Sequence, residues 1–435
     1  MSQRARWQCS LGNGAALLGA LWLSAAACSS SSSSTAALGR GQSGSSAAQA
    51  GAVTRGGADG AAVGARPVGQ GGASADAEGQ TVGGLVGGGA SPGSGLDAGV
   101  VALNPVAVHG QLQVVGTDLR DAAGKPVQLK GVSSQWLNYE SKPFPESKPA
   151  IGYARDHWKL SVLRAAMGVD AAGGYLGTGT GANADAATMQ SKVNTIIENA
   201  IDLGIYVIVD WHTSNAVTAT ASQATQAAAF FTDIAHRYGS APNLIYETYN
   251  EPNRVTWAQI KPYHEAVVAA IRAEDPDNLI ILGTPTFSQD VDIAARDPVA
   301  GTNLLYTLHF YACTHRQPLR DKATTAIAAG IGLFVTEFGS TPSDGGVPTR
   351  GDPYVCEGET ETWFSWMADH NVSGAAWKLD QCADTSCLLS AAAPVDGPWT
   401  DDVLSSDADA TSIDGGVRPA AGGGHGQFVV DWLRE

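Results

Sequence analysis

The chain has 435 residues and a formal net charge of −16, which is enough length for one large domain with additional segments. The charge is uneven: residues 1–28 hold two arginines and no acid, residues 29–106 hold three arginines and four acids, and the remainder carries −17. So acidic a balance argues against nucleic acid as a partner, because a phosphate backbone requires a basic surface. It is compatible with an uncharged partner, and it also keeps an exported protein soluble.

The first 28 residues have the features of an export signal. Arg4 and Arg6 precede an apolar run, Ala15 to Ala27, that is too short to span a bilayer. The run ends in Ser-Ala-Ala-Ala-Cys, which resembles a bacterial lipobox, and this implies a lipidated Cys28 and attachment to a membrane. The alternative is ordinary cleavage after an Ala-x-Ala site. Both alternatives predict an exported protein, either secreted or anchored at the bacterial cell surface as a lipoprotein.

Residues 29–106 consist mainly of Gly, Ser and Ala and contain no Trp or Tyr. Such a composition cannot bury enough apolar surface to offset the loss of chain entropy on folding. We therefore predict a disordered, low-complexity linker without a carbohydrate-binding module. The folded domain is predicted over residues 107–435.

Short apolar runs alternate with amphipathic stretches from residue 107 onward. A lead-in formed by Gln111–Val115 and Val127–Leu129, with a Gly-Lys-Pro turn at Gly124, predicts a hairpin that runs into the first barrel strand. Each following run is short and almost continuously apolar, as in strands that are buried on both faces. The predicted strands are 127–134, 160–167, 206–212, 243–251, 279–285, 304–311, 332–339 and 374–380.

Helices are predicted between these strands. The stretch 189–203 has Val193, Ile196 and Ala200 at helical spacing, and Gly204 and Gly239 fit the C-caps of two helices. Eight alternations of strand and helix predict an α/β fold, a (β/α)8 TIM barrel with an N-terminal β-hairpin. The other predicted helices are 223–238, 257–273, 359–370 and 427–433, and residues 390–424 are predicted to form a loose loop.

Four cysteines remain in the predicted domain once Cys9 and Cys28 are set aside, and they allow three pairings. A Cys382–Cys387 bridge would close one loop, and its complement would join Cys313 to Cys356. A zinc site is the alternative, but the spacings fit no common zinc pattern.

Polar side chains stand at the ends of six of the eight predicted strands. In a parallel barrel the C-terminal strand ends share one face, and active sites lie there. Pro252 cannot continue a strand, so Asn-Glu-Pro places Glu251 at a strand end, and Thr-Glu-Phe-Gly places Glu337 at another. The candidate site residues are Arg164, His212, Asn250, Glu251, His309, Tyr311, Glu337 and Trp377.

The two glutamates fit the chemistry of glycosidic bond cleavage. Retaining glycosidases place two carboxyl groups about 5 Å apart, one as nucleophile and one as acid/base. Glu251 suits the acid/base role, with a pKa raised by burial and by the neighbouring carboxylate. Glu337 suits the nucleophile, with Arg164 to hold its charge and Tyr311 to donate a hydrogen bond to it.

The other candidates suit substrate binding. The Asn250 amide is placed to bind a sugar 2-hydroxyl, and His212 and His309 either bind other hydroxyls or tune the acid. Trp377 offers an apolar face to a pyranose ring, or else packs at the end of the barrel.

The motifs together resemble glycoside hydrolase family 5, in particular its bacterial endoglucanase (cellulase) branch, over nearly all of residues 108–435. The resemblance implies a retaining endo-β-1,4-glucanase that needs no cofactor or metal, acts on a β-glucan polysaccharide and is a monomer. The similar segments are HGQLQVVGTDLRDAAGKPVQLKGVSSQWLN, VLRAAM followed by GGY, VIVDWH, LIYETYNEPN, TLHFYA, FVTEFG and AAWKLD.

Carried over position by position, the resemblance implies the roles already given to the two glutamates and adds Trp136 as an aromatic of the substrate cleft. The chain departs from the family pattern at Gln135, where relatives often carry His, and at Gly168, where an aromatic is common. Other β-glycanases, such as a mannanase, a mixed-linkage glucanase or a xyloglucanase, are the alternatives. A non-catalytic carbohydrate-binding barrel is a further one.

Overall fold

The computed structural model describes residues 103–177, 184–214, 221–345, 354–382, 384–405, 411–412 and 424–435. The predicted export signal and nearly all of the predicted linker lie outside the described residues. Within the described part of the chain, none of the helices has the length and apolarity needed to cross a bilayer.

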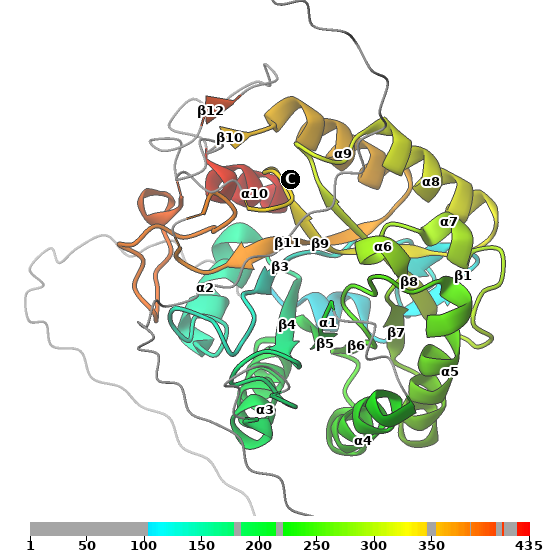
Figure 1. The fold of residues 1–435 in the computed structure, drawn as a ribbon. Coiled ribbons are helices and arrows are strands. Elements are labelled where there is room, and N and C mark those ends of the chain that lie inside the picture. The colour runs from blue at the N-terminus through cyan, green and yellow to red at the C-terminus, as the bar shows by residue number, and fades with distance from the viewer. Residues whose placement is uncertain are drawn as a thin grey trace, which may run out of the picture. The chain divides into compact units, whose positions relative to one another are not determined.

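Eight parallel strands close into a barrel, which confirms the predicted fold class (Figure 1). The strand order around the barrel follows the chain, with the last strand, β11, pairing with the first, β3. The strands are β3 (Lys130–Ser134), β4 (Val162–Gly168), β5 (Tyr206–His212), β6 (Leu244–Glu247), β7 (Leu279–Leu282), β8 (Leu304–Tyr311), β9 (Leu333–Gly339) and β11 (Ser373–Leu379).

Helices surround this ring of strands (Figure 1). Short additional elements are the helix α1 (Pro105–His109), the 3-10 turn η3 (Asp401–Val403) and the paired strands β10 (Tyr354–Val355) and β12 (Thr411–Ser412). The surrounding helices are α2 (Lys148–Trp158), α3 (Ala186–Leu203), α4 (Ala221–Tyr238), α5 (Trp257–Glu274), α6 (Pro285–Ser288), α7 (Val291–Ala294), α8 (Gln317–Ala328), α9 (Glu357–Asp369) and α10 (His425–Arg434).

The local sequence of α3 accounts for its limits. The side chain of Asp185 accepts a hydrogen bond from the backbone of Thr188, and Gly204 ends the helix in the left-handed conformation at φ +70°. Val193, Ile196 and Ala200 are buried on the face that packs against the barrel strands. The predicted helix and its C-cap are both confirmed.

The N-terminal hairpin is confirmed, but its second arm differs from the prediction. Strand β1 (Gln113–Val115) pairs antiparallel with β2 (Asp118–Arg120), across a turn at Gly116 with φ +66°. Residues 127–129 lie after a second turn at Gly124, where φ is +79°. A glycine at positive φ marks both turns, so the residue pattern alone does not choose between them.

The half of the barrel interior near the N-terminal strand ends is filled by apolar side chains. Every second residue of a strand points inward, and one or two positions from each of the strands β4 to β9 meet there. The hairpin and the segment after it cover this end with leucines and a valine. The packed residues are Val162, Tyr206, Ile208, Ile245, Leu279, Ile281, Leu305 and Phe334 from the strands, and Leu112, Leu119, Val127 and Leu129 from the cover.

The segment after β11 is only partly the loose loop that the sequence predicted. Residues 390–405 are described, and Trp399 is fully buried in a stack with Trp158 of α2 at 5.5 Å. Its indole donates to the carbonyl of Pro394, and Val403 and Leu404 are also buried. The large apolar side chains dispersed in a Gly-, Ala- and Asp-rich stretch anchor this half of the segment.

Two disulfides join the four cysteines of the domain. Cys313, after β8, is bonded to Cys356 at the start of α9, and Cys382 is bonded to Cys387 in the loop after β11. This is one of the three pairings that the sequence allows, and it removes the thiols that a zinc site would need.

Candidate active site

Glu251 lies beyond the end of its strand rather than at its last residue. Strand β6 ends at Glu247. Residues 248–251 continue beyond it and form individual backbone hydrogen bonds instead of a regular ladder. The backbone N–H groups of Asn250 and Glu251 donate to the carbonyls of Trp211 and Thr213 at 3.2 and 3.1 Å. The end of β5 therefore positions the Asn-Glu-Pro turn.

The structure brings the two predicted carboxylates together. Glu251, His309 and Glu337 each offer one polar atom, and these atoms lie within 4.8 Å of one another. Tyr311 donates to Glu337 Oε1 at 2.6 Å, and Arg164 donates to Glu337 Oε2 at 3.2 Å. Each carboxylate oxygen of Glu337 thus accepts a hydrogen bond from a buried donor.

Glu251 has a different environment. Its Oε1 lies 3.0 Å from Nδ1 of His309, and burial raises the pKa of Glu251 to about 7, although the charge of Arg164 acts to lower it. Of the two causes that the sequence suggested, burial is the one found here. A carboxyl group with a pKa near neutrality is suited to give and take a proton.

Arg164 is the centre of a buried ionic network. It is fully buried, and its guanidinium contacts Asp210 at 2.9 Å, Glu247 at 2.7 Å and Glu337 at 3.2 Å. It also donates to Asn250 Oδ1 at 2.6 Å, which turns the amide nitrogen of Asn250 away from the arginine. The five donors of the guanidinium group make such multiple contacts possible.

Asp210 and Glu247 belong to this ionic network, although the sequence analysis did not identify them. Burial raises the pKa of Asp210 to about 8 and raises the pKa of Glu247, while the charge of Arg164 lowers both. Each is the one acidic residue of a largely apolar run, YVIVDW for Asp210 and LIYETY for Glu247. A carboxylate in a strand buried on both faces needs a buried partner, and that signal points to these two residues.

Aromatic side chains form one side of the site. His212 stacks on Trp377 at 5.4 Å with nearly parallel rings, and Trp136 meets His212 edge-on at 4.4 Å. Nδ1 of His212 contacts Asp210 at 2.6 Å, and burial lowers the pKa of His212, so the ring is neutral. Trp377, Tyr311 and Trp136 share one small apolar cluster, which brings together residues of β11, β8 and the loop after β3.

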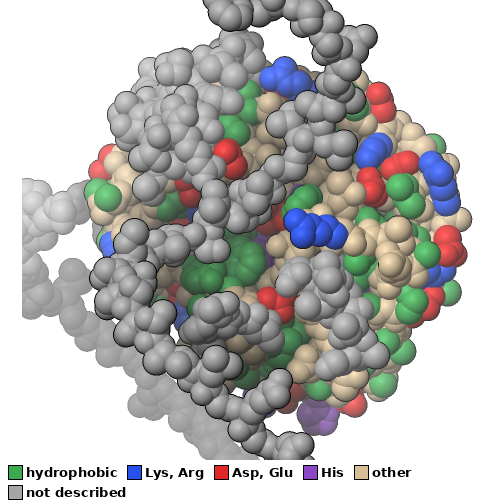
Figure 2. Space-filling model, viewed as in Figure 1, with side chains coloured by type: hydrophobic (Ala, Val, Ile, Leu, Met, Phe, Trp, Pro, Cys, Tyr) green, Lys and Arg blue, Asp and Glu red, His purple; other side chains and the backbone are tan. Residues whose placement is uncertain are grey.

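The site residues predicted from sequence therefore meet at one end of the barrel, and they come from strands that are far apart in the chain. The space-filling view shows hydrophobic and acidic side chains lying side by side near the middle of one face (Figure 2). The arrangement combines a carboxylate surrounded by donors, a carboxyl group with a raised pKa and an aromatic wall.

The family model described as cellulase (glycosyl hydrolase family 5) matches residues 120–383, which is more than half of the chain. The chain belongs to glycoside hydrolase family 5. All the candidate site residues described above lie inside the matched range.

Named relatives agree with the family. The chain is 42% identical over 306 residues to an endoglucanase of Clostridium saccharobutylicum, covering 68% of this chain and 63% of the relative. It is 42% identical over 282 residues to endoglucanase Z of Dickeya dadantii, covering 64% of this chain and 60% of the relative. The chain thus spans less than two thirds of the length of these relatives.

A solved structure supports the same fold. The catalytic domain of Thermobifida fusca endoglucanase Cel5A superposes with a TM-score of 0.64 at 29% identity, covering 76% of this chain and all of that domain.

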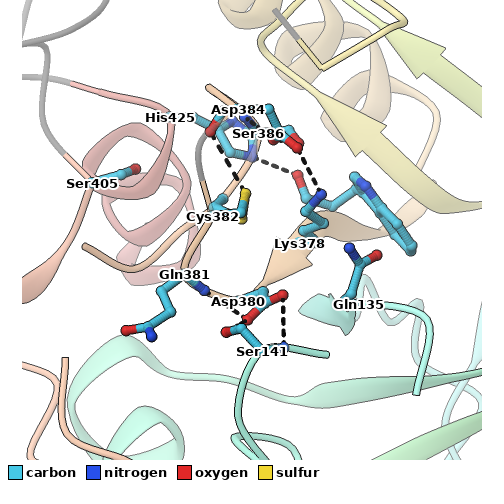
Figure 3. Close-up of a disulfide and its surroundings, with 12 residues drawn as sticks. Gln135, Ser141, Lys378, Asp380, Gln381, Cys382, Asp384, Ser386, Ser405 and His425 are labelled. Atoms are coloured by element: carbon cyan, nitrogen blue, oxygen red, sulfur yellow. Dashed lines mark hydrogen bonds and ion pairs between the residues drawn. A yellow bond between two sulfur atoms is a disulfide. The ribbon is translucent and has the colours of Figure 1, made fainter. Parts of the chain in front are cut away.

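In this family 5 member, the loop that follows β11 comes directly after the strand that carries Trp377. The ammonium group of Lys378, a residue of β11, pairs with Asp384 at 3.0 Å (Figure 3). Asp384 lies in the loop that the Cys382–Cys387 bridge closes. Nε2–H of His425 in α10 donates a hydrogen bond to the carbonyl oxygen of Trp377 at 2.6 Å. The loop and α10 together fix the position of Trp377.

The two departures from the family pattern have local explanations. The side chain of Gln135 accepts a hydrogen bond from the backbone of Trp136, so it is turned toward its own chain. Gly168 faces Asn138, whose side chain fills the space that a larger residue would need and donates to the carbonyl of Ala172. An amide thus occupies the place that the family pattern gives to a ring.

A metal is not needed to explain the clustered acids of this site. Hydrogen bonds to His309, Tyr311 and Arg164 satisfy Glu251 and Glu337. The fixed positive charge of Arg164 next to Glu337 also opposes a second cation. Cys382, Asp384 and Cys387 lie close together as well, but both sulfurs are bonded to each other.

Proposed function

We propose that the protein is a retaining endo-β-1,4-glucanase that hydrolyses internal bonds of cellulose-type polysaccharides by double displacement. The observation that carries the proposal is the pair Glu251 and Glu337, whose nearest oxygens are within 4.8 Å. This separation suits a nucleophile and an acid/base, whereas inverting enzymes place the carboxyl groups about 6.5–9.5 Å apart.

In the first step Glu337 attacks the anomeric carbon, and the bond from that carbon to the leaving oxygen breaks. Glu251 gives its proton to the leaving oxygen, for which a pKa of about 7 is suitable. The hydrogen bonds from Arg164 and Tyr311 hold the Glu337 carboxylate in a fixed orientation before the attack. A covalent glycosyl ester on Glu337 results.

In the second step Glu251 acts as base. It takes a proton from a water molecule, whose oxygen attacks the anomeric carbon and displaces Glu337. Glu251 regains the proton that it lost, so the cycle closes without a cofactor.

The remaining site residues suit sugar binding. The amide nitrogen of Asn250, turned away from Arg164, is suited to the 2-hydroxyl, where a hydrogen bond strengthens in the transition state. Neutral His212 can bind another hydroxyl, and His309 acts on Glu251. Trp377 and Trp136 offer faces to pyranose rings.

Cellulose-type glucan is the substrate that the relatives favour. They are named endoglucanases, and a Thermobifida fusca Cel5A structure, 28% identical, contains cellotetraose. Mannan, mixed-linkage glucan and xyloglucan are the alternative substrates. A non-catalytic carbohydrate-binding barrel is disfavoured because both carboxylates are present.

The proposal includes export. Residues 1–28 would direct export, Cys28 would carry lipid at the bacterial surface, and residues 29–106 would tether a monomeric barrel. Two disulfides in the domain support an oxidising compartment. Cys28→Ala should move the protein from the membrane fraction to the soluble fraction, and an unchanged membrane fraction would remove the lipid anchor from the proposal.

The experiment that tests the activity is reducing-end release from a soluble cellulose derivative, mixed-linkage glucan, xyloglucan and mannan, with Glu251→Gln as the control. Highest activity on the cellulose derivative, lost in the variant, is expected. Preference for mannan would keep the mechanism and change the substrate. Binding without turnover on every polymer would replace the enzyme with a binding protein.

A further inference from the structure

Thr336 lies next to Glu337 in sequence, yet both side chains reach the site. The register between β8 and β9 shifts between Thr307 and His309, which gives β9 one extra residue at this point. Such a bulge allows two successive side chains to face the same side. Glu337 contacts Arg164 and Tyr311, while Thr336 contacts a different set of partners.

The Thr336 hydroxyl links His309 to a buried carboxylate. Its Oγ1 donates to Glu247 Oε1 at 2.6 Å and lies 2.9 Å from Nε2 of His309. His309 Nε2 and Glu247 Oε1 are 4.0 Å apart, so the hydroxyl bridges them. On its other side, Nδ1 of His309 lies 3.0 Å from Glu251 Oε1. A continuous series of hydrogen bonds therefore runs from Glu247 through Thr336 and His309 to Glu251.

Which group donates in each of these hydrogen bonds follows from Glu247, the buried end of the series. Glu247 also receives hydrogen bonds from Arg164 at 2.7 Å and Thr307 at 3.2 Å, so it acts as an acceptor. The Thr336 proton is then directed to Glu247, and its oxygen must accept from Nε2–H of His309. Burial keeps the ring neutral by lowering its pKa to about 4, so Nδ1 carries a lone pair. That lone pair can only accept, and the donor facing it is the protonated carboxyl of Glu251.

We propose that Thr336 and Glu247 are positioning residues that fix His309 as the Nε2–H tautomer and thereby keep Glu251 protonated until the substrate binds. This inference rests on the proposed function, in which Glu251 is the acid. The opposite tautomer would donate Nδ1–H to Glu251 and stabilise its carboxylate, which would leave the acid without its proton.

The test compares Thr336→Val, which removes the hydroxyl and keeps the shape, with Thr336→Ser, which keeps the hydroxyl. The pH dependence of kcat/KM is measured with cellopentaose, whose leaving group needs a proton, and with 2,4-dinitrophenyl β-cellobioside, whose leaving group does not. Other charged or titratable groups that act on Glu251 or His309 stay unchanged in both variants: Arg164, Asp210, His212, Glu247, Tyr311, His315 and Glu337.

Thr336→Val should shift the alkaline limb of the cellopentaose profile to lower pH by about one pH unit, because Glu251 loses its proton more easily. Thr336→Ser should keep the wild-type limb. The dinitrophenyl substrate should show no such shift. An equal loss of rate on both substrates at every pH would overturn the proposal and leave Thr336 with a packing role.

A second measurement does not depend on the folding of a variant. Nitrogen NMR of the wild-type protein, with the His309 signals assigned by their loss in His309→Gln, reports which ring nitrogen carries the proton. Protonated Nε2 is expected, and protonated Nδ1 would overturn the proposal. If the wild type hydrolyses neither substrate, the proposed function fails. The NMR measurement of the His309 tautomer would still show whether the hydrogen bonds from Glu247 to Glu251 run in the proposed direction.

Discussion

Along β5, Tyr206 and Ile208 point into the N-terminal half of the barrel, whereas Asp210 and His212 point into the C-terminal half. The inward-facing residues of β8 change in the same way, from Leu305 in the apolar half to His309 in the polar half. Both halves are almost completely buried, but one is filled by dispersion contacts and the other by charges that need partners. Burial alone therefore does not distinguish a stabilising core from an active site.

The two halves differ in what a substitution should change. In the apolar half, a smaller side chain removes packing contacts, and the loss appears as stability. In the polar half, each group has partners in a network, so a substitution changes charge and orientation as well. The following variants test this division, from the largest expected effect to the smallest.

Glu337→Gln should lower kcat on the preferred polysaccharide by on the order of 10⁴-fold or more, because an amide cannot form the covalent intermediate. Oligosaccharide binding, followed by isothermal titration, should persist, because a nucleophile acts mainly in the transition state. Thermal melting provides the control. A parallel loss of binding and of the cooperative melt would instead indicate a misfolded barrel.

Arg164→Met should destabilise the protein by about 3–5 kcal/mol at neutral pH, because it leaves buried carboxylates without their counter-charge. Since Arg164 lowers the pKa values of Asp210 and Glu247, its removal raises both further. The folded variant then binds more protons than the unfolded chain, so its stability should fall as pH rises.

Urea unfolding of Arg164→Met and wild type at pH 5 and pH 8 measures this effect. The difference in the free energy of unfolding between the two proteins should be larger at pH 8 than at pH 5. A difference that is the same at both pH values would mean that packing, rather than uncompensated charge, explains the destabilisation.

Ile281→Ala, in the apolar half, should cost about 2–5 kcal/mol of stability through lost burial and the cavity left behind. At a temperature where the variant is folded, its kcat should match that of the wild type. Urea unfolding and reducing-end assays on the same preparation check both statements. A large loss of kcat in the fully folded variant would show that the two halves are mechanically coupled.

The sequence predicted the polar half only in part. Residues next to turn signals were identified, because Pro252 after Glu251 and Gly339 after Glu337 mark strand ends. Asp210 and Glu247 were missed because their apolar neighbours make them look like ordinary strand positions. Their partner, Arg164, is 46 and 83 residues away in the chain, and only closure of the barrel brings them together.

The fold itself was predictable because most of the eight strands lie in short, largely apolar runs, and their alternation with helices allows few topologies. The ends of individual strands were predicted less accurately than their number and order. Strand β6 is shorter than its apolar run, since the Asn-Glu-Pro turn takes its hydrogen bonds from β5 instead of a regular ladder. The burial of Trp399 was missed because its partner Trp158 belongs to α2, a helix that the apolar pattern did not reveal.

The contact between Gly168 and Asn138 also bears on how the site could be redesigned. A β-carbon at position 168 would meet the end of the Asn138 side chain, so that amide would have to turn away before a larger residue could be accommodated. Turning away would cost the hydrogen bond from Asn138 to the carbonyl of Ala172. Residue 138 therefore helps to decide which side chains position 168 can accept, and the two positions are best exchanged together.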